Sequence, residues 1–177
     1  MNTNKPHIPL DENSVGIVSL FGFSPATAPA LNNLAQVLLR GESTLSEGER
    51  EYIASYVSHV NKCTFCTNSH TAATEKLLGK EISFTPEAIA ELNPKMRALL
   101  TIAEKVATAP KTVSEEDIKL AKEFEATDKE IHDTVLIAAA FCMFNRYVDG
   151  LNTVQPENKE DYKDVGEKLA TEGYINS

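Results

Sequence analysis

Apolar residues recur every three or four positions along most of the chain, a spacing that predicts helices rather than strands. The clearest stripe comprises Tyr52, Ile53, Tyr56, Val57 and Val60. No alternation of apolar and polar residues bounded by turns indicates a strand, although residues 15–23 are short, apolar and ambiguous. The pattern therefore predicts an all-α fold of about seven helices.

Capping motifs indicate where these helices begin and end. Ser46 with Glu49, and Thr127 with Glu130, match the capping box S/T-x-x-E, in which side chains bond the free N–H groups of the first turn. Gly79 is a typical residue to end a helix, because glycine adopts a left-handed conformation without strain. Polar residues directly before proline add helix starts at Ser24, Thr85 and Asn93. We expect helices over about residues 25–40, 46–60, 63–78, 94–108, 127–149 and 160–171, with shorter ones after Thr85 and Ser114.

The chain has 177 residues, a length typical of one domain, and no Gly/Ser-rich linker divides it. We expect a single domain over residues 1–177, with residues 1–23 as an extended N-terminal segment packed on it. The formal net charge of −9 would repel phosphate backbones, which argues against nucleic-acid binding. The sequence has no basic tract that would attract anionic membranes, no apolar run long enough to span a bilayer, and no signal peptide. These features predict a cytoplasmic protein that binds neither nucleic acid nor membrane.

Two of the three cysteines form a C-x-x-C motif, and a histidine follows on the same helical face. Cys63 and Cys66 are three positions apart, and Cys66 and His70 are four apart, so all three side chains lie on one side of a helix. Their Cβ atoms would be about 5–6 Å apart, close enough for a disulfide after small adjustment and for the imidazole to reach a thiol. A helix that begins near Cys63 would also stabilise a thiolate through its positive N-terminal end.

Glu51 precedes Cys63 on the helix that we expect to run antiparallel to the one carrying the motif. At about 1.5 Å of rise per residue, its carboxylate falls nearly level with His70 rather than with Cys63. A carboxylate at that level would orient the imidazole and raise its basicity.

These residues alone leave several kinds of site open. The two motif cysteines, His70 and Glu51 could support redox chemistry, could ligate zinc, or could be inert. A c-type haem site is excluded, because Thr67 follows the second cysteine where that motif requires histidine. The third cysteine, Cys142, lies among large apolar residues, which predicts a buried and unreactive thiol.

The order and spacing of Glu51, Cys63, Cys66 and His70 resemble the signature of the alkylhydroperoxidase D family, within the carboxymuconolactone decarboxylase-like superfamily. The segments that resemble the peroxidase-related branch of that superfamily are Leu38–Gly41, Leu45–Glu51, Asn68–His70 and Phe144–Asp149. The resemblance extends from Ile8 to about Asp149, and four residues of fixed type and spacing rarely recur by chance.

The resemblance implies an alkylhydroperoxidase D-like fold with a helix-turn-helix core, assembly into trimers or hexamers, and thiol-dependent reduction of hydroperoxides. By position, Cys66 would attack the peroxide and Cys63 would resolve the sulfenic acid as a disulfide. His70 and Glu51 would form a proton relay. No cofactor or metal is implied, and the electron donor would be a partner thiol system that the sequence does not identify. Phe65 stands where the best-studied type carries a second histidine, so this relay has one donor fewer.

We therefore expect a homo-oligomeric antioxidant enzyme, a peroxidase of the peroxiredoxin type, that acts on a small-molecule hydroperoxide. One alternative is an acid–base enzyme similar to carboxymuconolactone decarboxylase that uses His70 and Glu51. The other alternative is a non-catalytic oligomeric protein that senses redox state or is stabilised by zinc.

Overall fold

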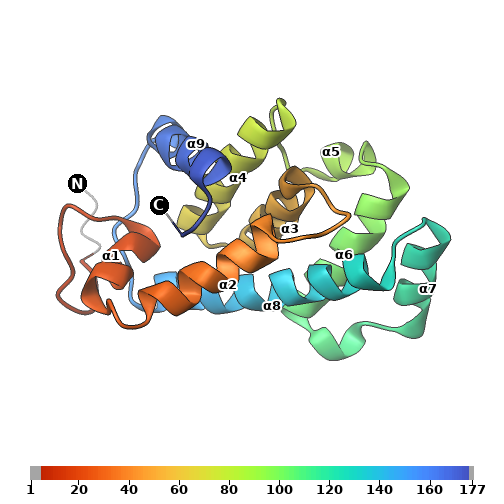
Figure 1. Cartoon of the computed structure of the whole chain (residues 1–177), viewed down its shortest axis with the longest axis horizontal. Helices are drawn as coiled ribbons and strands as arrows, with labels where there is room; N and C mark the ends of the chain where they lie inside the picture. The colour runs from red at the N-terminus through yellow and green to blue at the C-terminus, as the bar shows by residue number, and fades with distance from the viewer. Residues whose placement is uncertain (1–4, 176–177) are drawn as a thin grey trace.

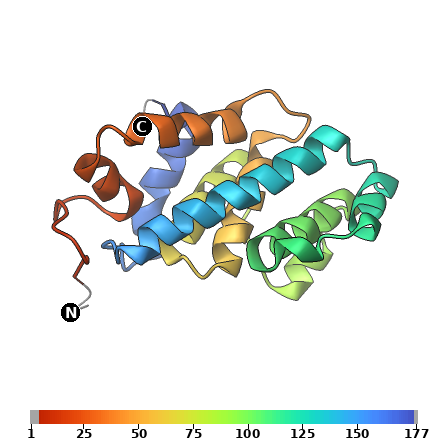
Figure 2. The same cartoon turned by 90° about the horizontal axis from the view of Figure 1, so that it is seen from below.

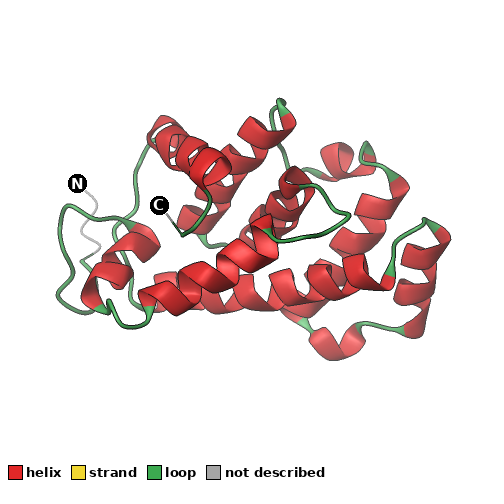
Figure 3. Ribbon diagram, viewed as in Figure 1, coloured by secondary structure: helices red, strands yellow, loops and turns green. Residues whose placement is uncertain are grey.

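A computed structural model describes residues 5–175, which form helices joined by loops (Figure 3). The α-helices are α1 (Gly16–Phe23), α2 (Ala28–Arg40), α3 (Glu47–Val60), α4 (Thr64–Leu78), α5 (Pro86–Ala90), α6 (Pro94–Thr108), α7 (Glu115–Glu123), α8 (Asp128–Gly150) and α9 (Lys163–Glu172). Two short 3₁₀ turns are η1 (Pro110–Thr112) and η2 (Lys159–Tyr162). No strand occurs in residues 5–175, and the all-α prediction is confirmed.

Most helices begin at the caps that the sequence predicts. The side chain of Ser46 accepts a hydrogen bond from the N–H of Glu49, whose carboxylate accepts one from the N–H of Ser46. This capping box begins α3, and an equivalent box begins α8. One predicted start is wrong, because residues 24–27 form a hydrogen-bonded turn and α2 begins only at Ala28.

The N-terminal segment is partly helical, which corrects the prediction of an extended segment over residues 1–23. Helix α1 forms within it, and Leu20 of this helix is completely buried. The N–H of Gly16 donates to the carbonyl of Val154 at 2.8 Å, which ties the start of α1 to the loop after α8. Because α1 also contacts α2 and α8, the segment packs on the rest of the domain. The first four residues of the predicted segment lie outside the described residues.

Helices α3 and α4 pack along each other as an antiparallel pair (Figure 1). The turn between them contains Lys62 at φ 62°, a left-handed conformation that reverses the chain within residues 61–63. Gly48 near the start of α3 faces Leu78 at the end of α4, and a Cβ at Gly48 would overlap that side chain. This close approach sets the register of the helix-turn-helix core.

Helices α8 and α9 cover this pair on different sides (Figures 1 and 2). Helix α8 packs against α3 and α6, and their contact is formed by completely buried residues such as Ile53, Leu99 and Ile137. Helix α9 lies on α4, where Gly166 approaches Ala72 so closely that a Cβ on the glycine would overlap it. No helix in the described part of the chain is long and apolar enough to cross a bilayer.

Candidate active site

The motif cysteines occupy the N-terminal end of α4. Cys63 is the N-cap residue and Cys66 lies in the first turn, as the sequence predicts. Both side chains are buried, and both thiols are free. The N–H of Cys63 donates to the carbonyl of Ser58 at 3.0 Å, which fixes the motif against the end of α3.

The two thiols have different surroundings. A hydrogen bond to Cys66, together with burial, raises the pKa of the Cys63 thiol well above its ordinary value of 9.0. Cys63 therefore stays protonated and lies within hydrogen-bonding reach of Cys66. Cys66 also lines a cavity, and Cys63 is not among the residues that line it. The two thiols therefore differ in their access to the cavity.

His70 and Glu51 form a buried pair at the level that the register of α3 and α4 predicts. Nδ1 of His70 lies 2.7 Å from Oε2 of Glu51, whose side chain is completely buried. This contact leaves Nε2 of the imidazole available to the cavity, which His70 lines together with Cys66. The ring packs nearly at right angles to Phe141, with ring centres 4.7 Å apart, and this packing holds its plane.

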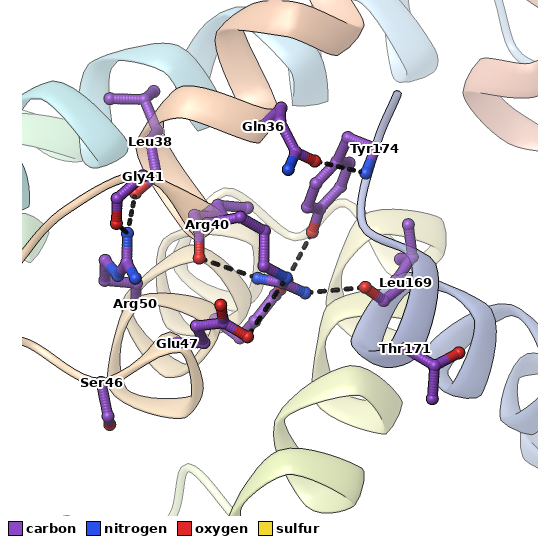
Figure 4. A network of polar contacts seen from close by, with 12 residues as sticks. Gln36, Leu38, Arg40, Gly41, Ser46, Glu47, Arg50, Leu169, Thr171 and Tyr174 are labelled. Carbon is purple, nitrogen blue, oxygen red and sulfur yellow. Dashed lines mark hydrogen bonds and ion pairs between the residues drawn. The ribbon is translucent and has the colours of Figure 1, made fainter. Parts of the chain in front are cut away.

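Two residues that were not predicted as site residues hold the other oxygen of Glu51. Nη2 of Arg40 lies 2.7 Å from Oε1, and the hydroxyl of Tyr174 donates to the same oxygen at 2.5 Å. The Tyr174 hydroxyl is also 3.3 Å from Nδ1 of His70. Arg40 donates a further hydrogen bond to the carbonyl of Leu169, which joins α2 to α9 (Figure 4).

The sequence held a signal for one of these two residues. Arg40 is the third of the four residues in the segment Leu38–Gly41, which resembles the family. That resemblance alone assigns no role to Arg40. Tyr174 follows a polar amphipathic helix, and no spacing relates it to Glu51. Only the packing of α9 on α4 brings its hydroxyl to the carboxylate.

Burial and neighbouring charges shift the pKa values of Glu51 and Arg40 in opposite directions. Burial raises the pKa of Glu51, but the charge of His70 and the hydrogen bonds that the carboxylate accepts outweigh burial, so this pKa lies below its ordinary 4.5. Burial and the adjacent Glu51 charge raise the pKa of Tyr174 well above 10.0. Burial lowers the pKa of Arg40, but Glu51 outweighs burial and the net shift is upward. Glu51 is therefore an ionised carboxylate that accepts hydrogen bonds from protonated donors.

A cavity of about 520 Å³ adjoins the motif. Its walls come from α1, α2, α4, α8 and α9, and most of the side chains that line it are apolar. Cys66, Ser69 and His70 of α4 form a polar strip on one wall, and among the described lining residues Lys168 alone carries a fixed charge. A cavity of this size and character suits a small organic molecule whose reactive group meets the polar strip.

Comparison with known proteins gives this site a family context. The model of the carboxymuconolactone decarboxylase family matches residues 25–104. A solved structure titled uncharacterized peroxidase-related protein, from Silicibacter sp., is 27% identical, with a TM-score of 0.75 over 83% of this chain and 78% of that chain. A second, titled alkylhydroperoxidase AhpD core and likewise uncharacterized, from Ralstonia eutropha, is 25% identical, with a TM-score of 0.74 over 85% of this chain and 80% of that chain. Among curated proteins, none matches this sequence.

The chain is similar to the carboxymuconolactone decarboxylase family over residues 25–104 and has an alkylhydroperoxidase D-like fold. The family match includes Arg40, Glu51 and the motif on α4, whereas α8 and α9 lie beyond it. Tyr174 therefore reaches this alkylhydroperoxidase D-like site from a part of the chain that the family model does not cover.

In this alkylhydroperoxidase D-like site, Phe65 is a packing residue. It is buried, its ring centre lies 6.0 Å from that of Tyr162, and its ring edge faces Gly16. It lines the cavity next to Cys66. Phe65 thus joins α4 to the N-terminal segment, while the donors to Oε1 of Glu51 come from α2 and from the residue that follows the turn after α9.

A zinc site formed by the motif is not supported in this protein. The two oxygens of Glu51 face Arg40, Tyr174 and His70, and a guanidinium at this position would repel a metal cation. Within residues 5–175 no cluster of three or more His, Cys, Asp or Glu side chains could hold a metal ion. The zinc-stabilised alternative therefore lacks a ligand set in this part of the chain.

Cys142 of α8 is half-buried rather than fully buried as predicted. Its sulfur is 3.4 Å from Nδ2 of Asn61, and it is not among the residues lining the cavity.

Proposed function

We propose that this protein is a thiol-dependent hydroperoxide reductase with a dithiol/disulfide cycle. The Cys66 thiolate attacks the terminal oxygen of the hydroperoxide, the O–O bond breaks, and a sulfenic acid and an alkoxide form. His70 returns to the alkoxide the proton that it took from the Cys66 thiol, and the alcohol leaves. The Cys63 thiol then attacks the sulfenic sulfur, which forms the disulfide and releases water.

One observation carries this proposal: Cys66 and His70 line the same apolar cavity, whereas Cys63 lies beside Cys66 outside the lining. A peroxide that enters the cavity would meet Cys66 and the imidazole first. The sulfenic acid formed there would have the Cys63 thiol as its neighbour. The order of access thus matches the order of the two thiol steps.

Glu51 supports the proton transfers from behind His70. Its ionised carboxylate contacts Nδ1 at 2.7 Å and stabilises the imidazolium that forms when Nε2 accepts the thiol proton. Arg40 and Tyr174 hold this carboxylate in place through Oε1. The polar groups of the relay therefore come from α2, α3, α4 and the segment after α9.

The remaining features of the proposal concern partners. The cycle needs no bound cofactor, and an unidentified partner thiol would reduce the disulfide. Assembly into a trimer or hexamer, a cytoplasmic location and the absence of nucleic-acid and membrane binding stay predictions. Leu136 and Met143 are exposed on α8, which leaves apolar surface on that helix for a second copy of the chain.

Thiol counting tests the proposed cycle. The reduced protein has three thiols, and one equivalent of cumene hydroperoxide should remove two of them without intermolecular crosslinking. A Cys142→Ala variant should react at the wild-type rate and end with no free thiol. Retention of all three thiols after treatment with peroxide would contradict the proposal.

The buried acid–base pair favours a second candidate function. His70 and Glu51 would also suit an enzyme that moves protons on a bound substrate, similar to carboxymuconolactone decarboxylase, whose family model matches residues 25–104. Alkylation of the thiols distinguishes the two, because small adducts on Cys63 and Cys66 would abolish a thiol peroxidase. An acid–base enzyme would keep its activity after the same treatment.

A further inference from the structure

Ser69 has a buried hydroxyl without a hydrogen-bond partner in the described part of the chain. The residue is only 2% exposed, and it lines the cavity between Cys66 and His70. A buried hydroxyl without a partner costs free energy in lost hydration unless something bonds to it. Rotation about the Cα–Cβ bond of Ser69 would turn its hydroxyl towards the cavity, where a ligand would accept its hydrogen bond.

The neighbouring hydroxyls show that Ser69 is different. Buried serine and threonine side chains in helices commonly donate to the carbonyl four residues earlier. Thr67 does so to Cys63 at 2.8 Å, Thr74 to His70 at 2.7 Å, and Ser58 to Ala54 at 2.9 Å. The hydroxyl of Ser69 makes no such bond to its own helix.

Two other buried hydroxyls also lack partners, those of Thr71 and Thr153, but neither residue lines the cavity. Ser69 combines the two properties, because its hydroxyl is unpartnered and the residue lies on the cavity wall. It is three positions from Cys66 along α4, so the two side chains project from one helical face.

We infer that Ser69 is a substrate-binding residue whose hydroxyl donates a hydrogen bond to the peroxide group of an organic hydroperoxide. The inference rests on the proposed function and adds to it the residue that recognises the O–O group. The apolar walls would contact the organic part of the substrate, and the strip of Cys66, Ser69 and His70 would contact its oxygens.

The hydrogen bond would act where charge develops. When the Cys66 sulfur forms a bond to the terminal oxygen, the O–O bond breaks and the electron pair moves to the oxygen attached to carbon. A donor aimed at that oxygen stabilises the alkoxide until His70 delivers its proton. Ser69 loses no proton in this step. The overall reaction is still that a thiol and a hydroperoxide become a sulfenic acid and an alcohol.

Two reagents distinguish this role from an effect on the thiolate. In a Ser69→Ala variant, the rate constant of Cys66 with cumene hydroperoxide should fall about ten- to hundredfold, the factor expected for a lost hydrogen bond to a charged group. The rate constant of Cys66 with iodoacetamide, which carries no peroxide oxygen, should stay within about twofold of wild type. Because the hydroxyl bonds nothing in the folded chain, the thermal midpoint of the variant should equal or exceed that of wild type.

Ser55→Ala is the matched control, since Ser55 is a completely buried helix serine whose hydroxyl bonds the carbonyl of Tyr52 away from the cavity lining. It should leave both rate constants unchanged. A Ser69→Ala variant with the wild-type peroxide rate, or with equal losses for both reagents, would overturn the inference and leave the proposed function standing. A wild-type protein that consumes no peroxide would overturn the proposed function and this inference together.

Discussion

The hydroxyl of Tyr174 lies 2.5 Å from Oε1 of Glu51, although 123 positions separate the two residues. Gly173 makes this contact possible, because its φ of 73° turns the chain back after α9. The N–H of Tyr174 then donates to Oε1 of Gln36 in α2 at 2.7 Å (Figure 4). The segment after α9 thus stabilises the buried carboxylate behind His70.

A Tyr174→Phe variant should remove one of the hydrogen bonds to Glu51 and leave those from Arg40 and His70. The carboxylate of Glu51 would lose one donor, so its pKa would rise towards the ordinary value and the acid limb of the pH–rate profile would move to higher pH. We expect the free energy of unfolding to fall by about 1–3 kcal/mol. Stopped-flow rates with peroxide between pH 4 and 8, with urea unfolding at pH 7, measure both effects.

Tyr52→Phe provides the control for that variant. The hydroxyl of Tyr52 bonds the carbonyl of Ser83 at 3.3 Å, and Tyr52 is not a cavity residue. Its loss should not move the pH–rate profile. An unchanged profile in the Tyr174→Phe variant as well would show that the tyrosine contact does not influence the relay.

Glu51→Gln should destabilise the protein in a pH-dependent way. The folded-state pKa of Glu51 is lowered, so the ionised carboxylate contributes stability above its ordinary pKa of 4.5, and that contribution is lost as the pH falls through the folded-state value. At pH 7 the variant leaves the Arg40 charge without its buried partner and should lose about 3–5 kcal/mol. The difference from wild type should shrink below about pH 4.5, as urea unfolding at several pH values would show.

The exposed pair of Lys76 and Glu167 gives a control for that experiment. Glu167→Gln removes a solvent-exposed carboxylate and should not change the unfolding curve measurably. A Glu51→Gln variant with an equally unchanged curve would contradict the buried ion pair.

Gly16→Ala should disturb the wall of the site next to Phe65. Gly16 has φ +52°, and a Cβ there would overlap the Phe65 ring. Gly79→Ala is the matched control, because Gly79 has φ +65° and nothing within 4 Å of the added Cβ. The control should lose about 1–2 kcal/mol from backbone strain alone, and Gly16→Ala should lose more. In a Phe65→Ala background, the additional cost of Gly16→Ala should fall to that of Gly79→Ala. Equal unfolding free energies for the two single variants in the wild-type background would contradict the contact.

The cavity should discriminate between hydroperoxides by size. Gly22 lines the cavity, and nothing lies within 4 Å of a Cβ built on it, so Gly22→Leu would place a side chain there without displacing the backbone. The variant should reduce the rate with cumene hydroperoxide more than the rate with hydrogen peroxide. Gly150→Leu, at a glycine with equally open surroundings but remote from the cavity lining, should affect neither rate. Equal effects of Gly22→Leu on both peroxides would show that substrate enters elsewhere.

Local patterns were sufficient to predict most of the helices and the level of Glu51 beside His70. Caps act within one helical turn, and the short connection between α3 and α4 leaves little freedom in their register. The level of Glu51 beside His70 therefore follows from the helical rise. The common face of Cys66 and His70 follows from their spacing, and the cavity that both line is consistent with it.

The parts that sequence patterns could not predict depend on contacts between distant segments. Tyr174 reaches Glu51 because α9 packs on α4 through Gly166, and the residue pattern within α9 does not indicate that the two helices lie so close together. The helix α1 was missed because a short apolar segment does not distinguish a helix from a strand, and its start is tied to the rest of the chain by the bond between Gly16 and Val154.

The most direct test of the account is the trapping of sulfenic acid in two variants, each of which lacks one motif cysteine. In Cys63→Ser, Cys66 should oxidise once and stall, because the thiol that resolves it is absent, and dimedone should label Cys66. In Cys66→Ser, Cys63 should stay unlabelled, because its burial still raises the pKa of its thiol and it is not among the cavity-lining residues. Mass spectrometry after one equivalent of peroxide should therefore find the adduct on Cys66 alone. An adduct on Cys63 in the Cys66→Ser protein, with none on Cys66 in Cys63→Ser, would contradict the assignment.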